Sequence, residues 1–476
     1  MRAAAAISAR RARSAGPKSR ITRNESRDSR SREAVSSTTT GGYRKTGTRC
    51  ITRYTTCERT VPPMTTADVF SADVFSAEAL QDPYPLFERL RNAGDVHFLA
   101  DQQVYVVLGF DAIRTVLADP HTYSSNLVAV LSAASGSATV SVAEAGAGVD
   151  VLATADPPAH TAQRALVMSR FSPRAVAETT ELIDAAVAPA VAGLVASGGG
   201  DWMTTVAHRV PVQVIGELIG LPRKDHQRLA AWSDAAIDLV SGVASPERAG
   251  QAALAVLEFA GYLGECLDQA GPDADAGVLG SVAAAVAAGT LTRDQGAMLL
   301  VQLVTAGAES TTSLLGTAVR LLADDPQLQA TLRAEPDRIG ALVEEAVRIE
   351  SPFRGHFRVT TAPTRLAGVR LEPGARLMLM WGASNRDPRI FDRPDQVDLD
   401  RVQPKLHHSF GRGIHFCLGA HLARKETTQA VRALLAATST ISLDGTEPVY
   451  VPNLMVRRLA HLHLSLTPVD SRPGSS

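Results

Sequence analysis

The stretch that decides the fold is residues 410–419, which read F-G-R-G-I-H-F-C-L-G. Its cysteine, Cys417, follows a loop punctuated by Gly411 and Gly413 and precedes an apolar run that predicts a helix. A thiolate at the start of a helix receives backbone N–H donors and the positive end of the helix dipole. We therefore expect the pKa of Cys417 to fall and its sulfur to bind a metal. Gly419 has no Cβ, which lets a flat cofactor approach the backbone closely.

An isolated cysteine is more often a buried, inert thiol, but the neighbours of Cys417 favour a different interpretation. The haem-binding signature of the cytochrome P450 superfamily resembles the pattern Phe410-Gly411-x-Gly413-x-His415-x-Cys417-x-Gly419, continuing to Ala423-Arg424. The resemblance implies a mainly α fold with small β-sheets in one large domain. It also implies haem b as the cofactor, with its iron held by the Cys417 thiolate and with Phe410, Gly411 and Gly419 beside it.

The composition sets outer bounds on the function. The chain has 476 residues, is 45% hydrophobic and carries a formal net charge of −1, so it can form a large core and its body has no nucleic-acid-binding character. No run of 18 apolar residues occurs, and the longest candidate, Gly296–Ala308, is too short to span a membrane and contains Gln302. Four cysteines in a chain of this length make no disulfide framework. We expect a cytoplasmic protein with reduced thiols.

The N-terminal segment differs from the rest in composition. Residues 1–60 contain 13 Arg and 2 Lys against 4 Asp and Glu, and they lack apolar periodicity, so we expect residues 1–63 to be a disordered leader. The leader could be a transit peptide, a basic arm for an acidic partner, or the result of an over-long gene start with Met64 as the true first residue. We favour the last, because the family-like pattern begins just afterwards, at residues 82–85. Residues 64–476 are then the cytochrome P450 domain.

Most of this domain has helical periodicity. The clearest helices are predicted at residues 174–197, 202–219, 247–270, 291–323 and 338–349. Alternation typical of strands occurs at Val104–Leu108, Leu377–Met380 and Val449–Leu466. Residues 127–153 are predicted to form a mobile loop, and residues 385–409, with three prolines, an irregular packed segment.

The predicted helix 291–323 carries a charged residue among apolar neighbours. Glu309 follows Gly307, and a glycine inside a helix costs about 1 kcal/mol relative to Ala, which suggests that something needs room there. By the resemblance, this helix crosses the haem, and an acid–alcohol pair at Glu309 and Ser310 delivers protons to bound oxygen. The family has threonine at the second position, so we leave open whether Ser310 or Thr311 supplies the hydroxyl.

Two further sets of residues acquire a role through the resemblance. Glu345 and Arg348 correspond to a structural Glu-x-x-Arg pair that ties its helix to the irregular segment, with Arg401 as a third partner. The propionates of haem need cationic or N–H donors, and the positions that match are His160, Arg164, Arg358 and His415.

These features predict a bacterial-type monooxygenase that inserts one oxygen atom from O2 into a small apolar organic substrate. By resemblance, electrons come from NAD(P)H through a separate ferredoxin reductase and ferredoxin, and a basic docking surface would comprise Arg170, Arg174, Arg412, Arg424 and Lys425. Ordinary solvated charges explain those residues equally well. A peroxide-driven peroxygenase and a non-catalytic haem-binding sensor or carrier are the alternatives. The only polar residues that hint at the substrate are Arg354 and His356.

Overall fold

The computed structural model describes residues 73–126, 129–131, 139–141, 149–271 and 277–469, all of which belong to the unit Pro62–Ser476. The predicted leader lies outside these residues. The α-helices are α1 (Ala77–Gln81), α2 (Tyr84–Ala93), α3 (Phe110–Ala118), α4 (Ala159–Met168), α5 (Pro173–Ala177), α6 (Thr180–Ala196), α7 (Arg209–Ile219), α8 (His226–Leu239), α9 (Pro246–Ala270), α10 (Gly277–Ala287), α11 (Arg293–Asp324), α12 (Pro326–Ala334), α13 (Ile339–Ile349), α14 (Trp381–Ser384) and α15 (Ala420–Ala437).

The strands are short and form small sheets. Their bounds are β1 (Val96–Leu99), β2 (Val104–Val107), β3 (Tyr123–Ser124), β4 (Ala129–Leu131), β5 (Thr139–Ser141), β6 (Gly199–Asp201), β7 (Gly355–Thr360), β8 (Thr364–Leu366), β9 (Val369–Leu371), β10 (Arg376–Met380), β11 (Thr438–Leu443) and β12 (His463–Pro468). A five-stranded sheet has the order β1-β2-β10-β7-β3, in which β2 and β10 are parallel and the other pairs antiparallel. A three-stranded antiparallel sheet has the order β11-β12-β6.

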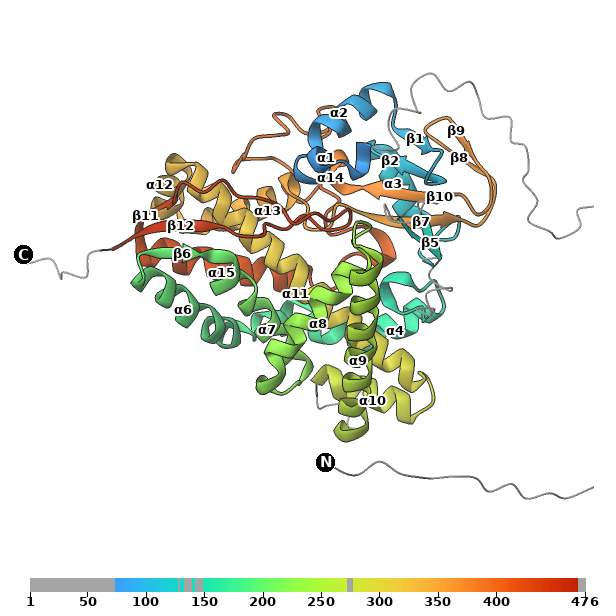
Figure 1. Cartoon of the computed structure of the whole chain (residues 1–476), viewed down its shortest axis with the longest axis horizontal. Coiled ribbons are helices and arrows are strands. Elements are labelled where there is room, and N and C mark those ends of the chain that lie inside the picture. The colour runs from blue at the N-terminus through green and yellow to red at the C-terminus, as the bar shows by residue number, and fades with distance from the viewer. Residues whose placement is uncertain (1–72, 127–128, 132–138, 142–148, 272–276, 470–476) are drawn as a thin grey trace, which may run out of the picture. The chain divides into compact units, whose positions relative to one another are not determined.

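Helix α11 is the axis of the helical part (Figure 1). It begins with a capping box, in which the Thr292 hydroxyl accepts from the Gln295 N–H while the Gln295 side chain accepts from the Thr292 N–H. It packs against α7, α8, α9, α13 and α15, and its apolar residues join a core drawn from all of these helices. A helix surrounded in this way can place a side chain from its middle deep inside the protein.

Most of the predicted elements are confirmed. Helices 247–270, 291–323 and 338–349 match α9, α11 and α13 to within two residues, and the two shorter strand predictions match β2 and β10. Residues 385–409 contain neither helix nor strand, as expected. Of the predicted mobile loop, residues 129–131 and 139–141 pair as β4 and β5, while residues 127–128, 132–138 and 142–148 lie outside the described part.

The predicted helix 174–197 is wrong as one continuous element. The chain breaks between α5 and α6, because the Thr179 hydroxyl donates to the Val176 carbonyl oxygen at 2.8 Å and Lys425 donates to the carbonyl oxygens of Val176 and Ala177. These contacts satisfy the carbonyls that end α5. The predicted helix 202–219 begins with a π-helical turn, Met203–Ala207, before α7.

The predicted strand Val449–Leu466 is also mostly wrong. Only its last residues belong to β12, and residues 451–462 are irregular apart from isolated pairing. Pro452 cannot donate to a strand ladder, and the Asn453 side chain accepts from the backbone N–H groups of Met455 and Val456 at 2.8 and 2.9 Å, which makes a turn. The alternation was real, but local side-chain bonds override it.

By length and composition, α11 could cross a membrane, and so could a bent pair of segments, Ala159–Ala177 with Thr180–Ala196, if they counted as one. In α11, however, 67% of the apolar window is buried inside the protein. Burial of this extent is what a core helix shows, and α11 is the helix around which the others pack.

Candidate functional site

The loop that carries Cys417 is held in a tight conformation ahead of α15. The Cys417 N–H donates to the Phe410 carbonyl oxygen at 2.7 Å, which closes the loop on itself. Gly413 has a φ of +66°, and a Cβ there would lie 2.7 Å from the Leu117 carbonyl oxygen, so this position needs glycine. A Cβ on Gly419, in contrast, would meet nothing within 4 Å. The loop therefore leaves open space beside its cysteine.

Opposing effects act on the thiolate form of Cys417. Burial raises its pKa, against the backbone N–H groups of Gly419 and Ala420 and the cations Arg424 and Arg164, which lower it. The net pKa is raised above its ordinary value, so the expectation of a lowered pKa is wrong. The expected donors are present, but the burial of the thiol outweighs them. Binding to a metal deprotonates such a thiol outright.

Basic side chains from two elements converge on this loop. The rings of His160 on α4 and His415 lie 4.1 Å apart, and the Arg164 guanidinium donates to the Phe416 carbonyl oxygen at 2.7 Å. Arg358 on β7 is only 6% exposed, and it lowers the pKa of His415, whose value falls to about 3 mainly through burial. The structure thus brings together all four residues predicted to bind propionates.

These residues have unused binding capacity. Within the described part of the chain, Nδ1 of His160 and Nε2 of His415 are buried without a hydrogen-bond partner, and the Arg358 guanidinium meets only the Phe357 carbonyl oxygen, at 2.7 Å. A buried cation with no carboxylate at hydrogen-bonding distance is costly. A flat dianionic cofactor beside Cys417 would satisfy these groups, so the residues fit haem.

Glu309 lies in the middle of α11 and is 3% exposed. Its Oε2 accepts from Arg458 Nη1 at 3.1 Å, while its Oε1 is buried and has no partner among the described residues. Burial raises its pKa to about 7, more than Arg458 lowers it. A carboxyl group that titrates near neutral pH can both give and accept a proton under working conditions.

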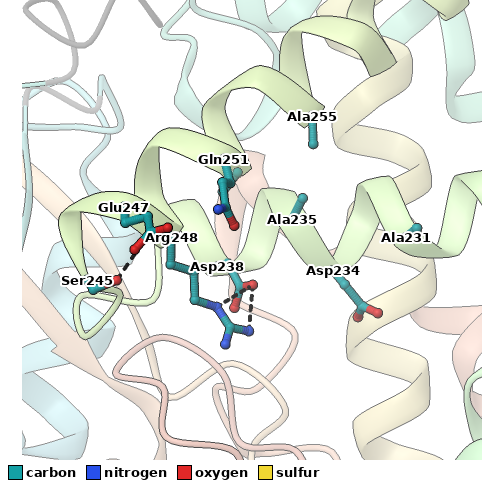
Figure 2. A pocket seen from close by; sticks show the side chains of 10 residues that line it. Ala231, Asp234, Ala235, Asp238, Ser245, Glu247, Arg248, Gln251 and Ala255 are labelled. Carbon is teal, nitrogen blue, oxygen red and sulfur yellow. Dashed lines mark hydrogen bonds and ion pairs between the residues drawn. The ribbon is translucent and has the colours of Figure 1, made fainter.

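Arg458 connects Glu309 to the surface. The same Nη1 lies 2.9 Å from Asp234 Oδ1 and 2.8 Å from His208 Nε2. The Asp234 side chain is 45% exposed and borders an open polar depression between α8 and α9, where Arg248 of α9 reaches Asp238 of α8 (Figure 2). The depression is lined by Ala231, Asp234, Ala235, Asp238, Ser245, Glu247, Arg248, Gln251, Ala252 and Ala255. One arginine therefore links a buried acid to a solvent-exposed one.

The two hydroxyls after Glu309 have different surroundings. Ser310 is partly exposed, and its hydroxyl donates to the carbonyl oxygen of Ala306, one turn earlier and itself exposed, at 2.7 Å. Thr311 is 3% exposed and belongs to the buried side of the helix. The hydroxyl that borders open space is that of Ser310.

The Glu345–Arg348 pair is fully buried and lies on α13. Arg348 Nε and Nη2 each lie 2.8 Å from a Glu345 oxygen, and Arg401 Nε is also 2.8 Å from Glu345. Arg348 additionally donates to the carbonyl oxygens of Asn385 and Pro394. The prediction of a three-residue network that ties this helix to residues 385–409 is confirmed.

Arg354 does not face a substrate. It is 4% exposed, and its guanidinium donates to the backbone carbonyl oxygens of Ala79, Leu80 and Val456. The hint that it recognises a substrate acceptor is therefore wrong, because its donors are already used. His356 is partly exposed and lies between the rings of Phe353 and Trp381.

Comparisons with known proteins show the family of this chain. Residues 279–458 match the family model described as cytochrome P450. Cytochrome P450 144 from Mycobacterium tuberculosis is 40% identical over 392 residues, covering 82% of this chain and 90% of the relative. Cytochrome P450 monooxygenase PikC from Streptomyces venezuelae is 33% identical over 395 residues, 80% of this chain and 90% of that protein. The Tepidiphilus thermophilus P450 heme domain has a TM-score of 0.76 at 25% identity, covering 83% of this chain and 96% of that one.

Fold and site together define a haem-thiolate oxidoreductase. The chain belongs to the cytochrome P450 family, whose members bind haem b through a cysteine thiolate, and it is a monooxygenase of that family.

Sequence reasoning missed Arg458, His208 and Asp234. Asp234 lies on α8, His208 directly precedes α7 and Arg458 lies in the irregular segment before β12. Their contacts span more than 140 residues of sequence from Glu309 to Arg458. The available signal was the charge of Glu309 in an otherwise apolar helix, and this signal does not indicate which residue pairs with it.

Proposed function

We propose that the Cys417 thiolate would hold the haem iron in this enzyme and that His160, Arg164, Arg358 and His415 would bind the haem propionates. The observation that carries this proposal is a pair of buried imidazole nitrogens, His160 Nδ1 and His415 Nε2, that have no hydrogen-bond partner among the described residues. They lie with the buried Arg358 beside a cysteine loop that leaves open space. When bound, haem b supplies the activation of O2 and the transfer of one oxygen atom to the substrate.

We propose that Glu309 supplies protons to the reaction. Its Oε1 has no partner among the residues that the structure describes, whereas its Oε2 is held by Arg458, so Oε1 is the atom that holds the proton. Its pKa of about 7 allows reprotonation from water, and the solvent-exposed Asp234 on the other side of Arg458 marks where water reaches this network. Ser310 is the hydroxyl that passes the proton on, because Thr311 is packed in the core.

Electrons are proposed to come from an acidic ferredoxin served by a separate reductase. A depression between α6 and α15 presents His421, Arg424, Lys425 and Arg432 against a single acid, Asp184. Of the earlier candidates, Arg424 is bound to Glu344 and Lys425 ends α5, so these two have structural partners. Arg174 and Arg432 are exposed and are better candidates for a charged partner.

The substrate is proposed to be a small apolar organic molecule, and the location the cytoplasm. Both described cysteines outside the leader, Cys266 and Cys417, are free thiols, which suits a reducing compartment.

The test has three parts. First, the reduced holoenzyme with CO should show the strongly red-shifted Soret band of a thiolate–haem complex, and Cys417→Ser should lose it; a histidine-type spectrum in the native protein would overturn the proposal. Second, a ligand screen by haem spectral shift should identify substrates. Third, turnover of such a ligand should require NAD(P)H, ferredoxin and reductase.

The same assay separates the alternatives. Turnover with peroxide but not with the redox proteins would favour a peroxygenase, and ligand binding without turnover would favour a sensor. For the electron partner, Arg174→Glu and Arg432→Glu should slow reduction at low salt, while Arg370→Glu on β9, whose parent side chain is 68% exposed, should not.

A further inference from the structure

A cluster of metal-ligating side chains lies at the edge of the three-stranded sheet. Asp201 ends β6, His463 begins β12, and the two residues pair directly in the antiparallel register. His461 lies two residues before His463, and one ligand atom from each of the three side chains lies within 4.8 Å of the others. None of these three side chains is among the residues proposed above to bind haem, deliver protons or meet the electron donor.

The sheet explains why both histidines face the same way. Leu462 and Leu464 are 0% and 2% exposed, so the alternation of an extended chain places His461 and His463 together on the outer side. Their rings lie 5.6 Å apart and nearly parallel, at 23°. The side chain of His461 is 61% exposed, which leaves the cluster open to ions from solvent.

The backbone fixes the carboxylate of this cluster. Asp201 Oδ1 accepts from the N–H groups of Met203 and Leu462 at 3.1 and 3.0 Å, which turns Oδ2 toward His461 Nδ1, 2.8 Å away. A carboxylate oriented by other hydrogen bonds is a hallmark of prepared metal sites. A simple His461–Asp201 ion pair would involve only one of the two histidines, and it would not account for the placement of His463 beside them.

We propose that Asp201, His461 and His463 form a binding site for Zn²⁺ or a similar borderline divalent cation, with water as the remaining ligand. Two imidazoles and one carboxylate suit such cations, whereas Mg²⁺ and Ca²⁺ prefer oxygen ligands alone. Bonds of roughly 2.0–2.2 Å bring tetrahedral ligand atoms to roughly 3.5 Å from one another. Side-chain rotations of the exposed His461 and the partly exposed His463 close the remaining distance.

A bound ion would also cross-link two segments of the chain. It would join the end of β6 to the start of β12 and to His461, which lies three residues after Arg458, the residue that holds Glu309. The expected effects are therefore binding of the ion and a higher thermal midpoint.

The test uses untagged holoenzyme stripped with a chelator and dialysed against ZnCl2. Elemental analysis should find about one zinc per haem iron, as expected for a single three-ligand site, and Mg²⁺ in excess should not displace it. His463→Ala is the decisive variant, because it leaves the hydrogen bonds of Asp201 and His461 intact. It should weaken Zn²⁺ binding by at least the roughly 10- to 100-fold that loss of a supporting residue costs at metal sites.

His121→Ala is the matched control, because His121 is an exposed histidine elsewhere on the surface, and its zinc content should equal that of the native enzyme. Zn²⁺ should raise the thermal midpoint of the native holoenzyme and of His121→Ala but not that of His463→Ala. The proposal is overturned if His463→Ala retains native zinc affinity or if the native enzyme binds no zinc. Because haem spectra and turnover are not the readout, failure here would leave the monooxygenase proposal untouched.

Discussion

Glu309 and Arg458 form a buried ion pair, with 3.1 Å between Oε2 and Nη1, although 149 residues separate them in the sequence. The arginine holds one oxygen of the acid, and the other oxygen has no partner in the described part of the chain. The acid is thus kept in place by a cation that is itself tied to the solvent-exposed Asp234. This arrangement gives Glu309 two properties that can be measured separately, its titration in the folded state and its role in turnover.

The titration of Glu309 should appear in the stability of the protein. The pKa of Glu309 in the folded state is about 7, above the ordinary value of 4.5. The protonated carboxyl group therefore stabilises the folded state, fully below pH 4.5, and this stabilisation is lost as the pH rises through about 7. When the pH is raised from about 5 to about 8, the free energy of unfolding of Glu309→Gln should fall by less than that of the native protein. Denaturant midpoints at both pH values test this. Glu178→Gln, whose parent side chain is 72% exposed, should behave like the native protein, and an unchanged pH dependence in Glu309→Gln would contradict the assignment.

The two hydroxyls after Glu309 should contribute unequally to turnover. Ser310→Ala removes the hydroxyl that borders open space, so reducing equivalents should be diverted to peroxide and product per NAD(P)H should fall. Thr311→Val keeps the shape of a core residue and should leave this ratio within error. Measuring NAD(P)H, peroxide and product in parallel decides between them. Full coupling in Ser310→Ala together with loss in Thr311→Val would reverse the assignment.

The buried network on α13 should dominate stability near the cysteine loop. Arg348→Met leaves the Glu345 carboxylate short of a partner and removes donors from the carbonyls of Asn385 and Pro394. Breaking such a buried pair costs about 3–5 kcal/mol, to be measured as the free energy of unfolding. Arg114→Met breaks the exposed Arg114–Asp111 pair and should change stability by no more than about 0.5 kcal/mol. Equal effects would mean that the buried network adds nothing.

Arg354 should matter for folding and not for ligand choice. Arg354→Ala leaves the carbonyl oxygens of Ala79, Leu80 and Val456 without their donor, which should cost about 1–3 kcal/mol. The dissociation constants of ligands, measured by haem spectral shift, should be the same in Arg354→Ala as in the native protein. A ligand that loses affinity only in Arg354→Ala would restore the role in substrate recognition that the sequence suggested.

The sequence predicted the features that depend on neighbouring residues. The cysteine loop and the Glu345–Arg348 pair each lie within ten residues of sequence. Glycine spacing identifies the loop, and the i, i+3 relation identifies the pair. The Glu309–Arg458 pair could not be predicted, because the spacing of one charge says nothing about a partner brought near by the fold. Local bonding also misled the prediction in one place, where Asn453 makes a turn inside an alternating segment. β11 was missed because it follows α15 without a clear boundary in composition.

The segment 385–409 has neither a helix nor a strand ladder, and its attachment to α13 depends on a few buried side chains around Glu345. Segments of this kind open as separate cooperative units, below the free energy of global unfolding. Since the segment leads directly into the cysteine loop, its opening would release the cofactor while α11 and its neighbours remain folded. On slow heating, the Soret band should therefore disappear before the far-ultraviolet circular dichroism of the helices. The lifetime of the loaded enzyme would then be set by a local opening rate, and the global stability of the helical core would have little influence on it.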